Sequence, residues 1–294
     1  MPVTLKNDYL TVKINQKGAE IVSVKDQKGT EYIWGANKEY WKRHAPILFP
    51  IVGRLQDDDY IYDGNSYHMY QHGFARDSEF EIESHNKTEV NFMLHSNAAT
   101  RKIYPFNFNL SIHYELDEHT IAVEMVVENI NPDPMYFSLG AHPGFNVPLF
   151  PKRETFDDYS VSVAPKHDYK IVRIDQNGYS NIKHPVEKTL DNPLQLKRDL
   201  FKHDAKVLDV SDNEQTTVML QSDVTDHGVA LTAYDCKYIG IWSTYPKEAP
   251  FVCLEPWWGI ADEEESTGFL KDKADISKLD PDESLNANFD ITFF

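Results

Sequence analysis

The chain has 294 residues and a formal net charge of −18, from 47 acidic and 29 basic side chains. This acidity repels nucleic acid and anionic membranes, so neither is an expected partner and a neutral small molecule is favoured. Hydrophobic residues make up 41% of the chain, enough for a packed core, and no apolar run approaches the length of a membrane span.

The first third of the chain alternates apolar and polar residues in short runs separated by turn-forming residues, which is typical of strands. A three-stranded meander is predicted at residues 11–14, 19–25 and 31–34. Residues 46–54 are apolar but contain two prolines, so we expect a buried, irregular loop there that delivers Arg54.

The middle and end of the chain continue the β pattern. Residues 63–65 read Asp-Gly-Asn and predict a hairpin between strands at 60–62 and 66–69. Between residues 148 and 206 the alternation weakens, and we expect long loops with short strands and one helical turn. Further strands are predicted at residues 90–94, 108–114, 121–127, 218–220, 229–234, 238–243, 251–254 and 288–294.

The organisation of the chain favours a single all-β domain over residues 1–294. The strand pattern resumes after the irregular middle stretch without a recognisable linker, so a domain boundary there is not favoured. We find no repeat of fixed period, no low-complexity tract and no strong amphipathic helix in the sequence.

Several common chemistries lack their sequence templates. The chain has no Gly-x-Ser-x-Gly, no phosphate-cradling glycine loop followed by lysine and no Cys-x-x-Cys. Its two cysteines, Cys236 and Cys253, stand in apolar surroundings and are expected to be buried free thiols. Together with the lack of a signal-peptide pattern at the start, this predicts a cytoplasmic protein.

One carboxylate has an unusual setting. Glu255 follows an apolar run and precedes Pro256, which has no N–H to donate, so we expect the strand to end there beside a pocket. The indoles of Trp257 and Trp258 offer flat apolar surfaces that stack on a sugar, while the carboxylate is available for proton transfer. The alternative is that both tryptophans belong to the core and Glu255 is an ordinary surface acid.

Two histidines and two arginines complete the candidate set. His142 precedes Pro-Gly and His72 precedes Gly, so each is presented from a turn beside apolar residues. A histidine both gives and takes a proton near neutral pH, since its ordinary pKa is about 6.5. Arg54 and Arg76 can donate planar hydrogen bonds to a substrate oxygen, with ordinary salt bridges as the alternative.

Three motifs, in this order, carry a resemblance to a known family. They are Gln-His-Gly-Phe-Ala-Arg at residues 71–76, Gly-Ala-His-Pro-Gly-Phe-Asn at 140–146, and Cys-Leu-Glu-Pro-Trp-Trp-Gly-Ile-Ala-Asp at 253–262. The chain resembles the aldose 1-epimerase (galactose mutarotase) superfamily, and its LacX-like branch in particular, over nearly its whole length. The resemblance implies an all-β, single-domain β-supersandwich with an open sugar-binding cleft and no obligatory cofactor.

The resemblance also implies roles for individual residues. His142 matches the general acid and Glu255 the general base, while His72 and Arg54 match supporting substrate contacts. Classical galactose mutarotases carry a further aspartate that fixes two sugar hydroxyls; no motif places it here, and Asp204 is the candidate. The candidates for stacking on the sugar ring are Trp242, Trp257 and Trp258.

Several readings remain open at this level. The first is a mutarotase acting on galactose, glucose or a close relative, as a monomer or homodimer without a metal. The second is a sugar-binding or sensing protein on the same fold. A hexose-6-phosphate mutarotase is a further alternative, although Arg54, Arg76 and scattered lysines assemble no clear phosphate cluster. A cupin-like metalloprotein using His72, His142 and Glu255 is the most distant.

Overall fold

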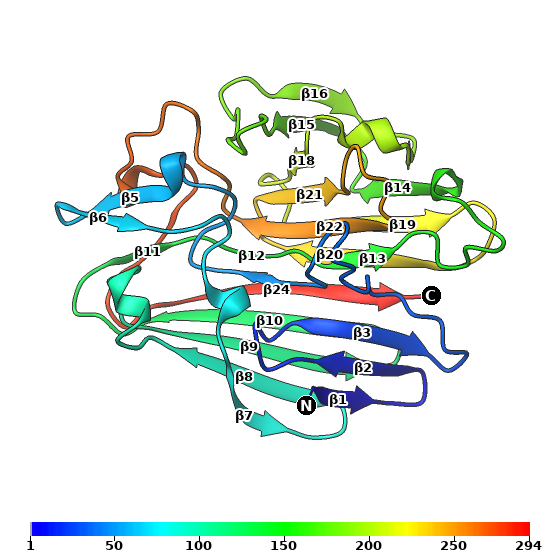
Figure 1. Ribbon diagram of the computed structural model, residues 1–294, viewed down its shortest axis with the longest axis horizontal. Helices are drawn as coiled ribbons and strands as arrows, with labels where there is room; N and C mark the ends of the chain where they lie inside the picture. Colours follow the sequence, from blue (N-terminus) through cyan, green and yellow to red (C-terminus); the bar gives the residue numbers. More distant parts are fainter. Residues whose placement is uncertain (1) are drawn as a thin grey trace.

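The computed structural model describes residues 2–294, and strands dominate it (Figure 1). No α-helix occurs in this described part of the chain, and the only helical segments are short 3-10 turns. These turns are η1 (Gln56–Asp58), η2 (Ala75–Asp77), η3 (Thr100–Lys102), η4 (Phe156–Asp158), η5 (Arg198–Phe201) and η6 (Leu270–Asp272). No helix in residues 2–294 is long and apolar enough to cross a membrane.

Two large antiparallel sheets dominate the molecule. The nine-stranded sheet has the order β17 (Leu194–Gln195), β14 (Tyr159–Ala164), β19 (Gln215–Ser222), β20 (Gly228–Tyr234), β24 (Ser284–Phe293), β10 (Thr120–Asn129), β9 (Phe108–Asp117), β8 (Glu89–His95), β7 (Glu81–His85). The eight-stranded sheet has the order β16 (Val186–Thr189), β15 (Asp168–Arg173), β18 (Lys206–Asp209), β21 (Tyr238–Trp242), β22 (Phe251–Trp258), β12 (Leu139–Ala141), β4 (Ile47–Leu48), with β13 (Gly144–Asn146) also on β22.

Three smaller sheets complete the fold. They are the meander β1 (Val3–Lys6), β2 (Leu10–Ile14) and β3 (Ile21–Asp26), the hairpin β5 (Asp59–Tyr62) and β6 (Asn65–His68), and the pair β11 (Met135–Phe137) and β23 (Ser277–Leu279). In Figure 1 the meander lies beside β8 to β10, and the hairpin projects from the opposite end of the molecule.

The core forms because alternate residues of the long strands point inward. In β9 the buried positions are every second residue, and their side chains are almost fully enclosed. Those residues are Phe108, Leu110, Ile112, Tyr114 and Leu116. By contrast, every residue of β22 is buried, because this strand lies inside the eight-stranded sheet and is covered on both faces. The prediction of an all-β fold is therefore confirmed.

The N-terminal meander has three strands, but they are not the three predicted. Residues 31–34 form only isolated bridges, and the Glu31 carboxylate accepts hydrogen bonds from the N–H groups of Val24 and Ile33. The missing strand is instead β1, before residue 11. The run 46–54 is irregular as expected, apart from the two residues of β4.

The prediction that the strand ends at Pro256 is wrong. β22 continues to Trp258, and Pro256 pairs with Ile239 of β21. On the other side of β22, Leu254 N–H donates to the Pro143 carbonyl, and the two-residue period directs the Pro256 nitrogen to that same side. There the partner backbone is interrupted between β12 and β13, so the proline nitrogen faces the interruption rather than a regular ladder.

Candidate active site

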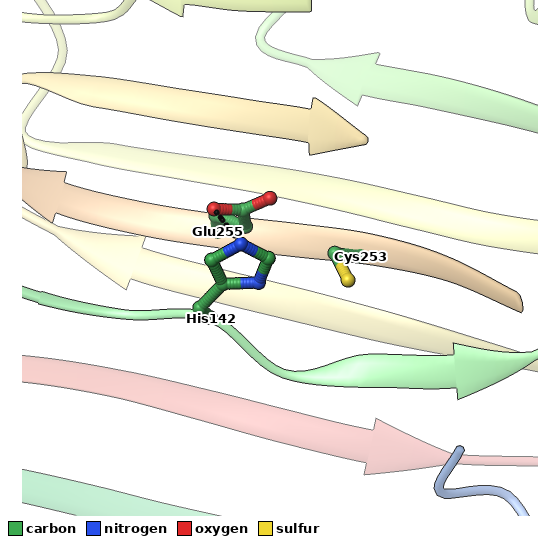
Figure 2. Close-up of side chains that lie close together, drawn as sticks. All are labelled: His142, Cys253 and Glu255. Carbon is green, nitrogen blue, oxygen red and sulfur yellow. Dashed lines mark ion pairs between the residues drawn. The ribbon is translucent and has the colours of Figure 1, made fainter. Parts of the chain in front are cut away.

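The interrupted partner of β22 places a histidine opposite Glu255. Leu139 of β12 pairs with Trp258, and Gly144 of β13 pairs with Cys253, so both strands keep one register against β22. In that register His142, between β12 and β13, stands opposite Glu255. Figure 2 shows its ring reaching toward the carboxylate, which projects from β22 as does Cys253.

His142 and Glu255 form a buried, close pair. His142 Nε2 lies 3.1 Å from Glu255 Oε2, with 8% of the histidine and 1% of the glutamate exposed. Neither carboxylate oxygen accepts a well-aligned hydrogen bond from residues 2–294. His142 Nδ1 is also without a partner in this part of the chain, and the Trp257 indole nitrogen lies near enough to Glu255 to lower its pKa but is not aligned with either oxygen. Buried polar atoms are nearly always paired in folded proteins, so four such atoms together mark a place for a polar ligand.

The surroundings of the pair favour its uncharged form. Burial raises the pKa of Glu255 well above its ordinary value of 4.5, and the Asp204 carboxylate raises it further. Burial, followed by the positive charge of Arg76, lowers the pKa of His142 to about 3. The neutral pair and the carboxylate–imidazolium pair hold the same single proton, so a shift across the 3.1 Å contact interconverts them.

His72 is brought to the same place by a strained turn. Its backbone has φ of 64°, and the next residue, Gly73, has φ of 67° with the Phe49 carbonyl where a side chain would stand. His72 Nδ1 accepts from Gly53 N–H, which leaves the other ring nitrogen to carry the proton. The His72 and His142 rings lie 5.7 Å apart, and burial lowers the pKa of His72 well below 6.5.

The two predicted arginines differ in position. The positive charge of Arg76 lowers the pKa values of both His72 and His142, so this guanidinium acts electrostatically on the site. Burial of Arg76 lowers its own pKa to about 10. The Arg54 guanidinium instead forms an ion pair with Asp58, with 2.8 Å between Nε and Oδ1, and donates to a backbone carbonyl. The partners of the Arg54 guanidinium are therefore Asp58 and a backbone carbonyl, and not the carboxylate of Glu255.

Asp204 and the tryptophans occupy different parts of the site. Asp204 is an exposed residue, yet atoms packed around its carboxylate raise its pKa, and its charge acts on Glu255. Trp242 meets the His142 ring edge-on, with 5.5 Å between centroids. Alternation along β22 puts Trp257 on the face of Glu255, whereas Trp258 packs into the main core. The prediction of Trp258 as a stacking residue is therefore wrong.

Comparison with known proteins places the chain in a family. A sequence model of the family described as aldose 1-epimerase matches residues 1–265. The chain belongs to the aldose 1-epimerase family. The plasmid and chromosomal LacX proteins of Lactococcus lactis subsp. lactis are each 35% identical over 304 aligned positions, covering 99% of this chain and 99% of each relative. The resemblance to the LacX-like branch is thus confirmed.

Solved structures of family relatives share the whole fold. A galactose mutarotase related enzyme from Lactobacillus acidophilus is 38% identical with a TM-score of 0.97, covering 100% of this chain and 97% of the relative. A galactose mutarotase-like protein from Lactobacillus casei is 31% identical with a TM-score of 0.90, covering 100% of both. The galactose mutarotase-like fold expected from the sequence is therefore confirmed.

Trp41 is a site residue that the sequence motifs do not reveal. Its indole stacks on the His142 ring, with 4.7 Å between centroids and 28° between planes, and lies edge-on to Trp242. The residue comes from an irregular loop before β4 and belongs to none of the three family motifs. Only its packing against the histidine marks it, so no signal in a single sequence could have found it.

Cys253 is the other unanticipated neighbour. Ligand atoms of His142, Cys253 and Glu255 lie within 4.8 Å of one another, the only such group in residues 2–294. It does not include His72, so the histidine–histidine–glutamate triad of the metalloprotein alternative is not assembled. Burial and the Glu255 charge raise the pKa of the Cys253 thiol well above its ordinary value, which disfavours the thiolate that a metal requires.

Proposed function

We propose that this protein is an aldose 1-epimerase that interconverts the α and β anomers of a hexose such as galactose or glucose. The observation that carries the proposal is the buried His142–Glu255 contact, whose carboxylate oxygens accept no well-aligned hydrogen bond from described residues. A sugar that enters the site supplies hydroxyl donors to those oxygens, and the indoles of Trp41 and Trp242 stand beside the pair.

The reaction needs a base at the anomeric hydroxyl and an acid at the ring oxygen. We assign Glu255 as the base and His142 as the acid. Hydroxyl donors from the bound sugar stabilise the carboxylate, and the single proton of the pair then moves across the 3.1 Å contact to the histidine. Glu255 removes the anomeric proton while His142 protonates the ring oxygen, and the carbon–oxygen bond of the ring breaks.

Closing the ring reverses these proton transfers. After rotation about the first carbon–carbon bond, the sugar hydroxyl attacks the opposite face of the carbonyl. His142 now takes the proton of that hydroxyl, and Glu255 returns a proton to the carbonyl oxygen. His72 stays neutral because its pKa is low, so it acts through its N–H as a hydrogen-bond donor and not as an acid.

The test is anomerisation of freshly dissolved α-galactose and α-glucose, followed by polarimetry. Glu255→Gln and His142→Asn are each expected to lower the catalysed rate by about 10²–10⁴-fold with the fold retained. Glu81→Gln, which removes an exposed carboxylate from edge strand β7, is the matched control and keeps the wild-type rate. Near-normal rates in either site variant would remove the acid–base pair, and a wild type that only binds sugar would support the sensing alternative.

A phosphorylated hexose is the second candidate substrate, for a specific structural reason. A hollow of about 280 Å³ is lined by four cations, with Glu20 and Asp77 as its acids. Arg43 forms an ion pair with Asp77, with 2.9 Å between Nη2 and Oδ2, and the charges of Arg43 and Arg76 lower the pKa values of both His72 and His142. The four are Lys17, Lys42, Arg43 and Arg76.

This candidate is separated from the first by comparing free and 6-phosphorylated sugars. A preference for the phosphorylated sugar that is lost in Lys42→Gln would support it. Equal use of both sugars, unchanged by Lys42→Gln, would rule out a phosphate site in this hollow.

A further inference from the structure

A separate cavity lies between the outer strands of the two large sheets. Its volume is about 570 Å³, within the range of small-molecule sites. One wall comes from Val161 and Val163 of β14, and the other from Ile171 of β15, Leu208 of β18 and Ile241 of β21. Figure 1 shows β15 and β16 at one end of the molecule, near β14. The cavity is lined by neither His142 nor Glu255, so it is distinct from the proposed active site.

Three cations line this cavity, namely Arg173, Lys188 and Lys206. Most of the remaining lining is aliphatic, and its other polar side chains are Asp175, Asn181, Glu187 and His203. Arg173 stands directly opposite Lys206 in the pairing of β15 with β18, and Lys188 stands opposite Tyr169 in the pairing of β15 with β16. Because residues 169 and 173 are separated by an even number of positions, all three cations share one face of the sheet. Like charges placed directly opposite each other destabilise a sheet.

These cations lack the partners that would offset their repulsion. Within residues 2–294 none of them forms an ion pair. Burial lowers the pKa of Lys206, and the charges of Lys188 and Arg173 lower it further. Two acids also line the cavity, but neither pairs with a cation of the described chain. The Asp175 carboxylate accepts hydrogen bonds from N–H groups of its own turn, and Glu187 is next to Lys188 in β16, so its side chain points to the opposite face of the sheet. Arg173 and Lys188 reach solvent and Lys206 is half-buried, and the three cations outnumber the two acids on the lining of a chain whose net charge is −18.

We propose that this cavity binds an anionic amphiphile, a single apolar chain ended by a carboxylate. The chain lies among the aliphatic side chains, where burial of apolar surface is favourable, and the carboxylate lies among Arg173, Lys188 and Lys206. The charge argument selects the class of ligand. An uncharged chain leaves the three cations repelling one another, and a cationic chain adds to that repulsion. The aliphatic side chains that form most of the lining would leave hydroxyls of a sugar without hydrogen-bond partners.

The first test is isothermal titration calorimetry of the full chain with sodium decanoate. We expect saturable binding with one site per chain, and at least about tenfold weaker binding of decan-1-ol and of decyltrimethylammonium, which share the apolar chain. No binding of decanoate, or equal affinity for the charged and neutral chains, would overturn the proposal.

Variants localise the binding to the cavity. The double variant Arg173→Gln with Lys206→Gln is expected to weaken decanoate binding about tenfold or more. Its control is Lys13→Gln with Lys25→Gln, which removes the same charge from exposed positions of β2 and β3 and leaves the affinity unchanged. Equal affinity in the two double variants would overturn the assignment of the cations.

A third variant tests the apolar part of the cavity. Ile171→Trp fills the space between the sheets and is expected to abolish decanoate binding, with circular dichroism confirming that the fold is retained. If this variant does not fold, the calorimetry of the charge variants decides the proposal alone. Glu255→Gln is expected to bind decanoate as the wild type does, so failure at this cavity and failure of the proposed mutarotase site are distinguishable.

Discussion

The free energy of unfolding of the wild type is expected to fall as the pH rises, because of Glu255. Replacing Glu255 by Gln is expected to remove this fall. Burial raises the pKa of this carboxyl well above 4.5, so the folded protein keeps a proton that the unfolded chain releases. The stability from that proton is complete below pH 4.5 and is lost as the pH rises toward the folded pKa. The slope is roughly 1.4 kcal/mol per pH unit for one proton.

His142 contributes the opposite slope over a lower pH range. Its pKa falls from 6.5 to about 3 on folding, so its contribution is present above pH 6.5 and is lost as the pH falls toward 3. Between pH 4.5 and 6.5 the two slopes cancel, and above 6.5 only that of Glu255 remains. The His142 contribution is present in both proteins, so relative to the wild type Glu255→Gln gains stability as the pH rises above 4.5, and this gain stops growing once the pH passes the folded pKa of Glu255.

Urea unfolding followed by circular dichroism at several pH values in that range measures the difference. Glu81→Gln is the control, because it removes an exposed carboxylate on β7 and is expected to keep the wild-type pH dependence. If wild type and Glu255→Gln lose stability in parallel across the range, the folded protein does not hold a neutral buried carboxyl at this position, and the reasoning from burial is refuted.

Three further substitutions test the architecture around the site. Gly73→Ala puts a side chain onto a backbone carbonyl at φ of 67° and is expected to cost at least about 1–3 kcal/mol in urea unfolding; a stability equal to wild type would contradict the close approach. Lys273→Met removes the cation paired with the buried Asp262 carboxylate, which among the described residues keeps only the Gln56 N–H, and is expected to cost about 3–5 kcal/mol near neutral pH; an unchanged stability in the same assay would show that this hydrogen bond is enough. Asp204→Asn lowers the pKa of Glu255, so the loss of stability with rising pH ends at lower pH; an unchanged unfolding profile would disprove the coupling.

The long strands could be predicted from the sequence because one face of each is buried. The pattern of β8, β9 and β10 repeats every two residues, and that period is the signature of a strand with one enclosed face. Shorter segments carry a weaker signal. The sequence does not predict β1, and residues 31–34 form only isolated bridges, because a few residues of alternation do not distinguish a strand from other extended chain.

The site shows the same division. The three motifs single out His142, His72 and Glu255, and the fold brings the first two rings together and joins His142 to the carboxylate. The sequence does not predict the partner of a long side chain. Arg54 forms its ion pair with Asp58 because the folded loop brings the two side chains together.

The sequence by itself determined the β architecture, the family and the residue types available for proton transfer, because local alternation and ordered motifs are properties of the chain. Only the tertiary structure decided that β22 runs through Pro256, that Trp41 stacks on His142 and that Asp204 acts on Glu255. Each depends on segments far apart in the chain. Burial and charge act through space, so His142 and Glu255 can share a proton only after folding has brought the two side chains together.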